Sequence, residues 1–288
     1  MTGPAPSLDP GYIAARTVLL DALDALAAHQ PALVAVGAQA VYLRTGSAGL
    51  TVAPYTTDGD LALDPTLLGD DPRLGEAMRH GGFALLVRND GGVEPGTWIG
   101  TTEVSGRPYS VPVDLIVPEG VLPGGRTRGA RLNAHGKRAA KRTHGLEAAL
   151  VDHDQMTLPG LAPYDDRQVE IAVAGAAALL VSKVIKLRDR VEQNRPHRLK
   201  DKDAGDVLRL IRATPVALMA GRLDVLRQDA VASAVTVEAL TGAAALFRAA
   251  GSPGVAMAVR AVELDLPADR VEAQLTGYFA ELERHFRA

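Results

Sequence analysis

The spacing of apolar residues changes along the chain, and the change divides the sequence into two parts. In the first part, short apolar runs bounded by glycine, proline and other turn residues predict strands. The predicted strands cover residues 32–36, 51–63, 83–88, 97–104, 109–117 and 169–173. Two of them form a predicted hairpin that turns at Ser105-Gly106-Arg107. Pro112 lacks a backbone donor, so its position in the strand is predicted to be at an edge or a bulge.

Helical spacing is present at the start of the chain and returns near residue 176. Leu19, Leu20 and Leu23 follow a Ser7/Asp9-Pro10 start signal and predict a helix over residues 13–29. A short helix is predicted over residues 39–44, directly after a strand that Gly37 ends. The later predicted helices cover residues 176–193, 201–212, 215–228, 236–249 and 267–287, with Gly251–Gly254 as an interruption.

This order of elements predicts an α+β fold with two domains. Residues 1–163 are expected to form a strand-rich α/β domain with a mixed sheet and flanking helices, and residues 164–288 a mainly helical domain. Hydrophobic residues make up 47% and charged residues 23% of the chain, which is typical of a globular protein. There are no cysteines, and no apolar run approaches the ~20 residues of a membrane span. We therefore expect a cytoplasmic protein without a membrane partner.

Two acidic residues lie two positions apart in the second predicted strand, in the sequence Thr57-Asp58-Gly59-Asp60. Side chains at i and i+2 of a strand share one face, so these carboxylates are expected to repel each other unless a cation lies between them. A third acid, Asp114, lies in a strand of apolar residues, where a lone carboxylate is costly unless it is paired or binds a metal. Three carboxylates on adjacent strands suit two Mg²⁺ ions. A solvated Asp-Gly-Asp turn with Asp114 paired to an arginine is the alternative.

Two further features favour a phosphate ligand. Gly37 and Ala38 end a strand and open a helix, where free backbone amides and the helix dipole favour the triphosphate of a nucleotide. A run of basic residues without any acid follows the Asp114 strand, and it is expected either to bind the phosphates of an acceptor RNA or to form a solvated loop. Its members are Arg126, Arg128, Arg131, Lys137, Arg138, Lys141 and Arg142. The net charge of -3 gives no general attraction to nucleic acid, and no DNA partner is expected.

With these motifs the sequence resembles the AbiEii/AbiGii-type toxins of the nucleotidyltransferase superfamily, including their mycobacterial relatives, over most of its length. The family's glycine turn corresponds to Gly37-Ala38, and its Asp-x-Asp strand led by Thr or Ser corresponds to Thr57 through Asp60. Its helical lysine corresponds to Lys183, and its Lys-Asp-x-x-Asp helix to residues 202–206. Ala38 replaces the usual Gly or Ser, and glycine is unusual between the two acids. The resemblance implies a polymerase-beta-like fold for the first domain.

The resemblance also implies roles for residues of the helical part. Lys183 is expected to bind nucleotide phosphates together with Thr57 and Lys186, and Lys186 lies on the same stripe of the helix as Lys183. Asp203 or Asp206 is expected to orient Lys183 or to assist deprotonation of the acceptor hydroxyl. A solvated basic helix face and a local ion pair between Lys202 and Asp206 are the alternatives.

These motifs predict transfer of a nucleoside monophosphate from an NTP to a hydroxyl, with catalytic Asp58, Asp60 and Asp114 as metal ligands. The expected acceptor is the 3′ end of tRNA, in a toxin that a cognate antitoxin protein counteracts. A second hypothesis is modification of a protein side chain or a small molecule at the same centre. A third is a catalytically silent nucleotide-binding module.

Overall fold

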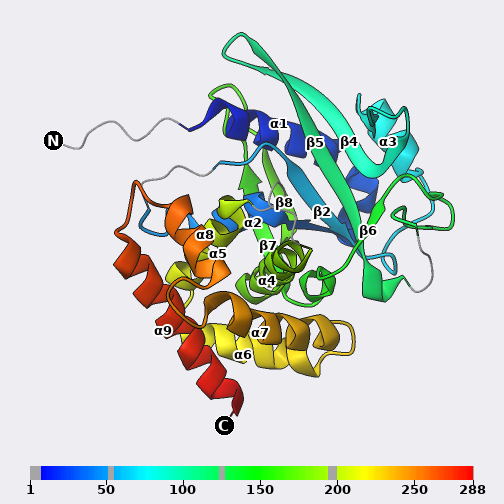
Figure 1. The fold of residues 1–288 in the computed structure, drawn as a ribbon. Coiled ribbons are helices and arrows are strands. Elements are labelled where there is room, and N and C mark those ends of the chain that lie inside the picture. Colours follow the sequence, from blue (N-terminus) through cyan, green and yellow to red (C-terminus); the bar gives the residue numbers. More distant parts are fainter. Residues whose placement is uncertain (1–7, 51–54, 123–126, 194–199, 288) are drawn as a thin grey trace. The chain divides into compact units, whose positions relative to one another are not determined.

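The computed structural model describes residues 8–50, 55–122, 127–193 and 200–287, and its architecture is α+β (Figure 1). Within these residues, eight strands form one mixed sheet in the order β3-β4-β5-β2-β1-β8-β7, with β6 paired to β5 off this path. The strands are β1 (Leu33–Val36), β2 (Gly59–Leu63), β3 (Ala84–Val87), β4 (Val93–Val104), β5 (Arg107–Pro118), β6 (Lys141–Thr143), β7 (His153–Pro159) and β8 (Gln168–Ala174).

In sequence order, α-helices come before the first strand, between strands and after the last strand. The α-helices are α1 (Pro10–Ala25), α2 (Gly37–Thr45), α3 (Leu74–His80), α4 (Ala176–Glu192), α5 (Asp201–Ala213), α6 (Val216–Gln228), α7 (Ser233–Phe247), α8 (Pro253–Ala261) and α9 (Ala268–Arg287). Short 3-10 helices are η1 (Ala27–Ala32), η2 (Glu119–Val121) and η3 (Glu147–Leu150). Among the helices described here, none is long and apolar enough to cross a membrane.

The chain divides into two compact units, each assembled from three segments. The sheet unit consists of Met1–Gln39, Ala53–Thr143 and Asp154–Val173. The helical unit consists of Ala40–Val52, His144–His153 and Ala174–Ala288. The division of the chain into domains 1–163 and 164–288 stays a prediction.

In the sheet unit, α1 covers one face of the sheet. A Cβ atom added at Gly59 would lie 3.1 Å from Leu19 Cδ1, and one at Gly100 would lie 2.5 Å from Val18 Cγ1. Because strand side chains alternate between faces, Asp60 points to the face opposite α1. The close approach of α1 explains the glycine between the acids: a β-branched residue at position 59 would collide with Leu19.

The predicted hairpin is confirmed, and its arms are longer than expected. Ser105 and Gly106 both have positive φ angles, of 52° and 74°, as a two-residue turn between twisted strands requires. Pro112 pairs with Ile99 of β4, and the pairing of β5 with β2 begins only at Val113. In the described pairing, Pro112 therefore lies where β5 has a single neighbour, in agreement with the predicted edge position.

Several predicted boundaries differ from the structure. Asp9 caps α1 through bonds from the amides of Gly11 (2.8 Å) and Tyr12 (3.1 Å), which confirms the start signal, but the helix ends at Ala25 because a 3-10 helix containing Pro31 follows. Strand β2 begins at Gly59, so Asp58 precedes it and does not lie inside it. Residues 51–54 of the predicted strand lie outside the described part of the chain.

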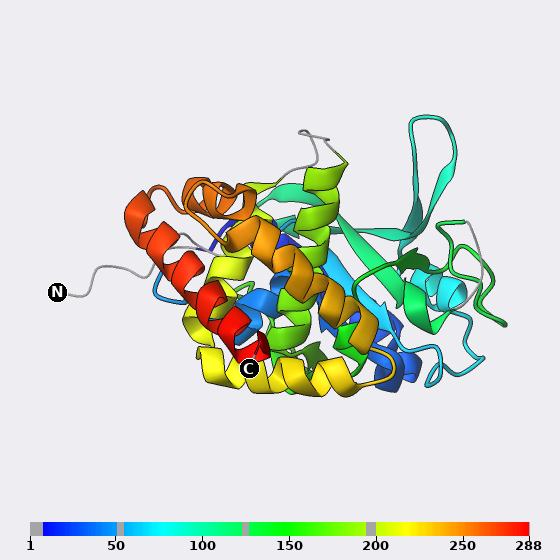
Figure 2. The same ribbon diagram turned by 60° about the horizontal axis from the view of Figure 1, so that its bottom comes forward.

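Besides the short 3-10 helices, two α-helices and two strands were not predicted: α3, α8, β6 and β7. The alternation signal is weak in β7 because most of its residues are exposed, and β6 has only three residues. Gly251–Gly254 was interpreted as an interruption, but α8 begins inside it with Pro253 in the first turn. In the helical unit, α6 (yellow), α7 (gold) and α9 (red) pack side by side, as Figure 2 shows.

Candidate active site

Polar side chains form a row across one face of the sheet. Asp60 of β2 pairs in parallel register with Asp114 of β5, and Asp114 pairs with Thr97 of β4. On the other side of Asp60, the row ends at Val36 of β1. Residues paired in register on adjacent strands lie about 5 Å apart and share a face. The structure thus brings Asp60 and Asp114 together, as their sequence pattern predicts.

A buried polar network holds Asp58 next to this row. Gln39 Nε2 donates to the backbone carbonyls of Asp58 (3.0 Å) and Ala15 (3.1 Å), and Arg16 Nε donates to Gln39 Oε1 (2.7 Å). Burial lowers the pKa of Arg16 from its ordinary value, an effect that Tyr12 partly offsets. The side chain of Asp58 accepts a hydrogen bond from Thr56, whereas the predicted Thr57 is exposed. The backbone position of Asp58 is therefore fixed from the core.

Sequence reasoning missed Arg16, Gln39 and Thr56. A signal for Arg16 was present, since it follows Tyr12 and precedes Leu19 and Leu20 at helical spacing, on the buried side of α1. A charged residue on an apolar stripe needs internal partners. Gln39 has no comparable signal because its partners, Ala15 and Asp58, are distant in sequence. Thr56 has none because it lies in an irregular segment before β2, where no periodic pattern applies.

Asp114 has two partners on its own face of the sheet. Thr97 Oγ1 donates to Asp114 Oδ1 at 2.7 Å, and Lys141 Nζ forms an ion pair with Asp114 Oδ2. Lys141 Nζ also lies 3.5 Å from Thr97 Oγ1. The side chain of Lys141 is 9% exposed and that of Asp114 is 22% exposed. Lys141 was predicted as an RNA-binding residue of the basic segment, and the structure instead places it at the acidic centre.

Gly96 makes room for the strand that carries Lys141. β6 pairs with Ile116, Val117 and Pro118 of β5, beyond the last pair that β5 forms with β4. Gly96 has a φ angle of 70°, and a Cβ atom there would lie 2.2 Å from the backbone nitrogen of Lys141. Only glycine tolerates both conditions, so Gly96 positions β6 and with it the lysine.

Gly37 also combines a positive φ angle with a close neighbour, here the side chain of Asp60. It begins α2 with a φ angle of 71°, and a Cβ atom there would lie 2.1 Å from Asp60 Oδ2. The Asp60 carboxylate therefore lies at the amino end of α2, where the backbone amides of the first turn and the helix dipole favour negative charge. Ala38, the other predicted nucleotide-binding residue of this turn, is 5% exposed.

The donor chemistry of this centre suits a divalent cation, but the side chains are arranged around Lys141. Asp58, Asp60 and Asp114 supply only carboxylate oxygens, the ligands that Mg²⁺ prefers. Across residues 8–50, 55–122, 127–193 and 200–287, no three acidic, histidine or cysteine side chains are gathered as a ready metal-binding group. The ammonium of Lys141 lies against Asp114 Oδ2, where a metal ion bound to this oxygen would lie.

Three members of the basic segment have acidic partners within the protein. Besides the pair of Lys141, Arg128 Nη1 lies 2.6 Å from Glu94 Oε1 and Arg142 Nη2 lies 3.2 Å from Glu119 Oε1. The segment itself contains no acid, but these three residues pair with acids from other parts of the sheet unit. Arg131, Lys137 and Arg138 are exposed, and Arg126 lies outside the described residues. RNA binding by the segment stays a prediction.

In the helical unit, the predicted Lys183, Asp203 and Asp206 bind one another. Lys183 Nζ of α4 lies 3.0 Å from Asp203 Oδ1 and 2.5 Å from Asp206 Oδ2 of α5. Lys186 Nζ and Arg190 Nη1 also contact Asp203, at 3.0 and 2.5 Å. Both predicted acids of α5 therefore contact the ammonium of Lys183.

Burial and charge act in opposite directions on this cluster. Burial lowers the pKa of Lys183, but Asp206 and Asp203 more than offset it and the pKa lies above its ordinary value. Burial raises the pKa of Asp203, but Lys183, Lys186 and Arg190 hold it well below its usual range. The cluster is therefore charged at neutral pH. Its participation in catalysis stays a prediction.

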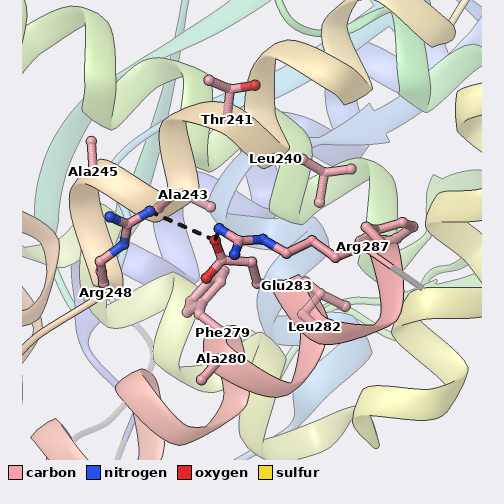
Figure 3. A pocket seen from close by; sticks show the side chains of 12 residues that line it. Leu240, Thr241, Ala243, Ala245, Arg248, Phe279, Ala280, Leu282, Glu283 and Arg287 are labelled. Carbon is pink, nitrogen blue, oxygen red and sulfur yellow. Dashed lines mark hydrogen bonds and ion pairs between the residues drawn. The ribbon is translucent and has the colours of Figure 1, made fainter.

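A pocket of about 570 Å³ lies between α7 and α9 of the helical unit. Figure 3 shows Arg248 and Arg287 extending toward Glu283, with which both form ion pairs, beside the apolar Phe279 and Leu282. None of the predicted site residues lines this pocket. It is therefore separate from the acidic centre in its lining residues and its chemistry.

Comparison of the sequence with protein-family models and with curated proteins gives no match.

Proposed function

We propose that the protein is a Mg²⁺-dependent nucleotidyltransferase with a polymerase-beta-like arrangement of its sheet unit, as its motifs indicate. The observation that carries this proposal is the placement of Asp60 and Asp114 in register on one face of β2 and β5. Asp58 lies two residues before Asp60, and its backbone is fixed by Gln39. Paired carboxylates in this setting are costly without a cation, which makes a metal-binding role the best account of them.

Each residue of the centre has a distinct part in the proposal. Asp58 and Asp60 hold Mg²⁺, and Asp114, oriented by Thr97, completes the catalytic site. Bound Mg²⁺ supplies Lewis acidity at the α-phosphate and neutralises charge on the departing pyrophosphate. The backbone amides of Gly37 and Ala38 donate hydrogen bonds to oxygens of the triphosphate.

The acceptor we propose is a hydroxyl at the 3′ end of tRNA, in a toxin that an antitoxin counteracts. This part rests on the resemblance, and the exposed Arg131, Lys137 and Arg138 offer a basic surface for RNA phosphates. A protein side chain or a small molecule is the competing acceptor, because the same acidic centre would serve it.

Labelling with α-³²P nucleotides separates these acceptors. Wild type and Asp60→Asn are incubated with Mg²⁺, each NTP in turn and either total tRNA, a protein lysate or aminoglycosides. We expect label in tRNA with wild type and a loss of at least about a thousandfold with Asp60→Asn, since a catalytic metal ligand is removed. Label confined to protein or to the small molecule would reassign the acceptor, and undiminished labelling by Asp60→Asn would refute the proposed centre.

A second candidate function is supported by the Lys141 ion pair. A lysine that satisfies Asp114 permanently would give a module that binds nucleotide without turning it over. Binding of an NTP in the presence of Mg²⁺, measured by calorimetry, combined with no labelled product from any acceptor would favour this candidate.

A further inference from the structure

The proposed reaction gives no role to Lys141, a buried cation at the acidic centre. It lies on β6, and the register of β6 with Ile116 places its side chain on the same face as Asp114, two residues earlier in β5. Its ammonium is paired with Asp114 Oδ2, and its side chain is only 9% exposed. A lysine at such a location is more than a member of a solvated basic loop.

The two oxygens of Asp114 have different partners. Oδ1 accepts a hydrogen bond from Thr97 at 2.7 Å, which fixes the plane of the carboxylate. Oδ2 contacts the Lys141 ammonium, whose contact to Thr97 Oγ1 is long, at 3.5 Å. Thr97 can therefore keep Asp114 oriented while the cation at Oδ2 changes.

The pair is also accessible enough to exchange. The side chain of Asp114 is 22% exposed, so water and ions reach it. Lysine is a point charge on a flexible four-carbon stem, and it can withdraw from a carboxylate without a change of the backbone. A divalent cation carries twice the charge of the ammonium and prefers the same oxygen ligand.

We propose that Lys141 is an exchangeable counter-ion of Asp114, which a divalent cation displaces when it binds the acidic centre. This inference rests on the proposed metal site and adds its regulation. While Lys141 occupies Oδ2, the centre is charge-paired without metal. When Lys141 is displaced, its ammonium becomes available beside the centre for the phosphate oxygens of a nucleotide.

The direct test is Mn²⁺ binding to the full chain without nucleotide, measured by electron paramagnetic resonance. Lys141→Met should bind Mn²⁺ about tenfold more tightly than wild type, the ratio for an ion pair worth about 1.4 kcal/mol. Lys141→Arg retains the charge and should show no such gain. Arg107→Met, at the exposed hairpin tip of the sheet unit, controls for general loss of positive charge and should leave the affinity unchanged.

A labelling experiment on the wild-type chain does not depend on the folding of any variant. A lysine-reactive ester, followed by mass spectrometry, should modify Lys141 slowly without Mn²⁺ and severalfold faster at saturating Mn²⁺. The exposed Lys137 provides the internal reference and should react equally in both conditions.

The outcomes separate this inference from the proposed function. Equal Mn²⁺ affinity of wild type and Lys141→Met, with unchanged labelling of Lys141, would overturn the exchange and leave the nucleotidyltransferase proposal standing. Absence of Mn²⁺ binding in both proteins would overturn both. Tighter binding by Lys141→Met without transfer to any acceptor would support the exchange and contradict the proposed function.

Discussion

Each unit of the protein contains a buried lysine bound to aspartate, and the two pairs differ in how firmly they are closed. Lys183 has two carboxylate partners, Asp203 and Asp206, whose side chains are at most 2% exposed. Among the described residues, Lys141 forms its ion pair with Asp114, whose side chain is 22% exposed. The first pair is surrounded by protein, and the second is open to solvent on the side of the acid.

This difference explains why similar ion pairs are expected to have different roles. A buried charge without its partner costs several kcal/mol, so a closed pair is held together by the penalty for separating it. A partly exposed carboxylate regains water or another cation when its lysine leaves, and the penalty is small. We therefore interpret the Lys183 cluster as fixed and the Lys141 pair as exchangeable.

The largest effect should come from removing the lysine of the closed pair. Lys183→Met leaves two buried carboxylates with less compensation and should lower the free energy of unfolding by about 3–5 kcal/mol. Urea unfolding measures it. The matched control is Lys186→Met, which removes another cation from Asp203 but one whose side chain is 46% exposed, and it should cost below about 1 kcal/mol. If both variants lost the same unfolding free energy, burial of the lysine would not determine how much its ion pairs stabilise the protein.

The second largest loss of stability should come from changing Gly96, which makes room for the strand that carries Lys141. Gly96→Ala combines a positive φ angle with a collision against the backbone of Lys141, and should cost about 2–4 kcal/mol in urea unfolding. Gly106→Ala has a similar φ angle of 74° but no atom within 4 Å of the added Cβ, so it should cost only about 1–2 kcal/mol. If Gly96→Ala were as stable as Gly106→Ala, β6 would be able to move away from the added methyl group without a loss of stability.

Removing the lysine of the open pair should have a smaller effect on stability. Lys141→Met should lower the free energy of unfolding by about 1–2 kcal/mol, since Asp114 regains contact with water. Added Mn²⁺ should then raise the melting temperature of Lys141→Met more than that of wild type. Thermal unfolding with and without Mn²⁺ checks both statements, and a loss as large as that of Lys183→Met would remove the distinction between the pairs.

The smallest effect concerns pH. The pKa of Asp203 is lower in the folded chain, so its contribution is present above its unfolded pKa of about 4 and is lost as the pH falls below it. The pKa of Lys183 is higher in the folded chain, so its contribution is present below about pH 10 and is lost above. Asp203→Asn should lower the free energy of unfolding by nearly the same amount at every pH from 5 to 9. This cost should vary by no more than about 0.5 kcal/mol over that range. A steady slope across that range would contradict the assignment of a closed, fully charged cluster.

The elements with strong periodicity could be predicted from the sequence. The long helices α4, α5, α6 and α9 match their predicted bounds to within one residue, because each repeats its pattern over more than ten residues. The β4–β5 hairpin was also predicted, with shorter arms than the structure has. The register of Asp60 with Asp114 agrees with the expectation that these acids lie on adjacent strands. Short or exposed elements such as β6 and β7 carry too few patterned residues to be recognised.

The parts of the site that were missed depend on contacts distant in sequence. Lys141 lies among other basic residues, and nothing in that run distinguishes the one that folds back against Asp114. Thr97 is paired with Asp114 only through the register of two strands. Gly59 appeared unfavourable from strand propensity alone, whereas in the structure Leu19 packs so closely against it that an added Cβ would lie 3.1 Å from Leu19 Cδ1.

The most direct test of the acidic centre compares label from two phosphates of the same NTP. Wild type, Asp60→Asn and the matched control Asp64→Asn, which loses a carboxylate just after β2, are incubated with Mg²⁺, total tRNA and either α-³²P or γ-³²P nucleotide. Nucleotidyl transfer predicts α-label in RNA with wild type and Asp64→Asn, no α-label with Asp60→Asn, and γ-label only in pyrophosphate. Transfer of γ-label to the acceptor, or full α-labelling by Asp60→Asn, would contradict the account.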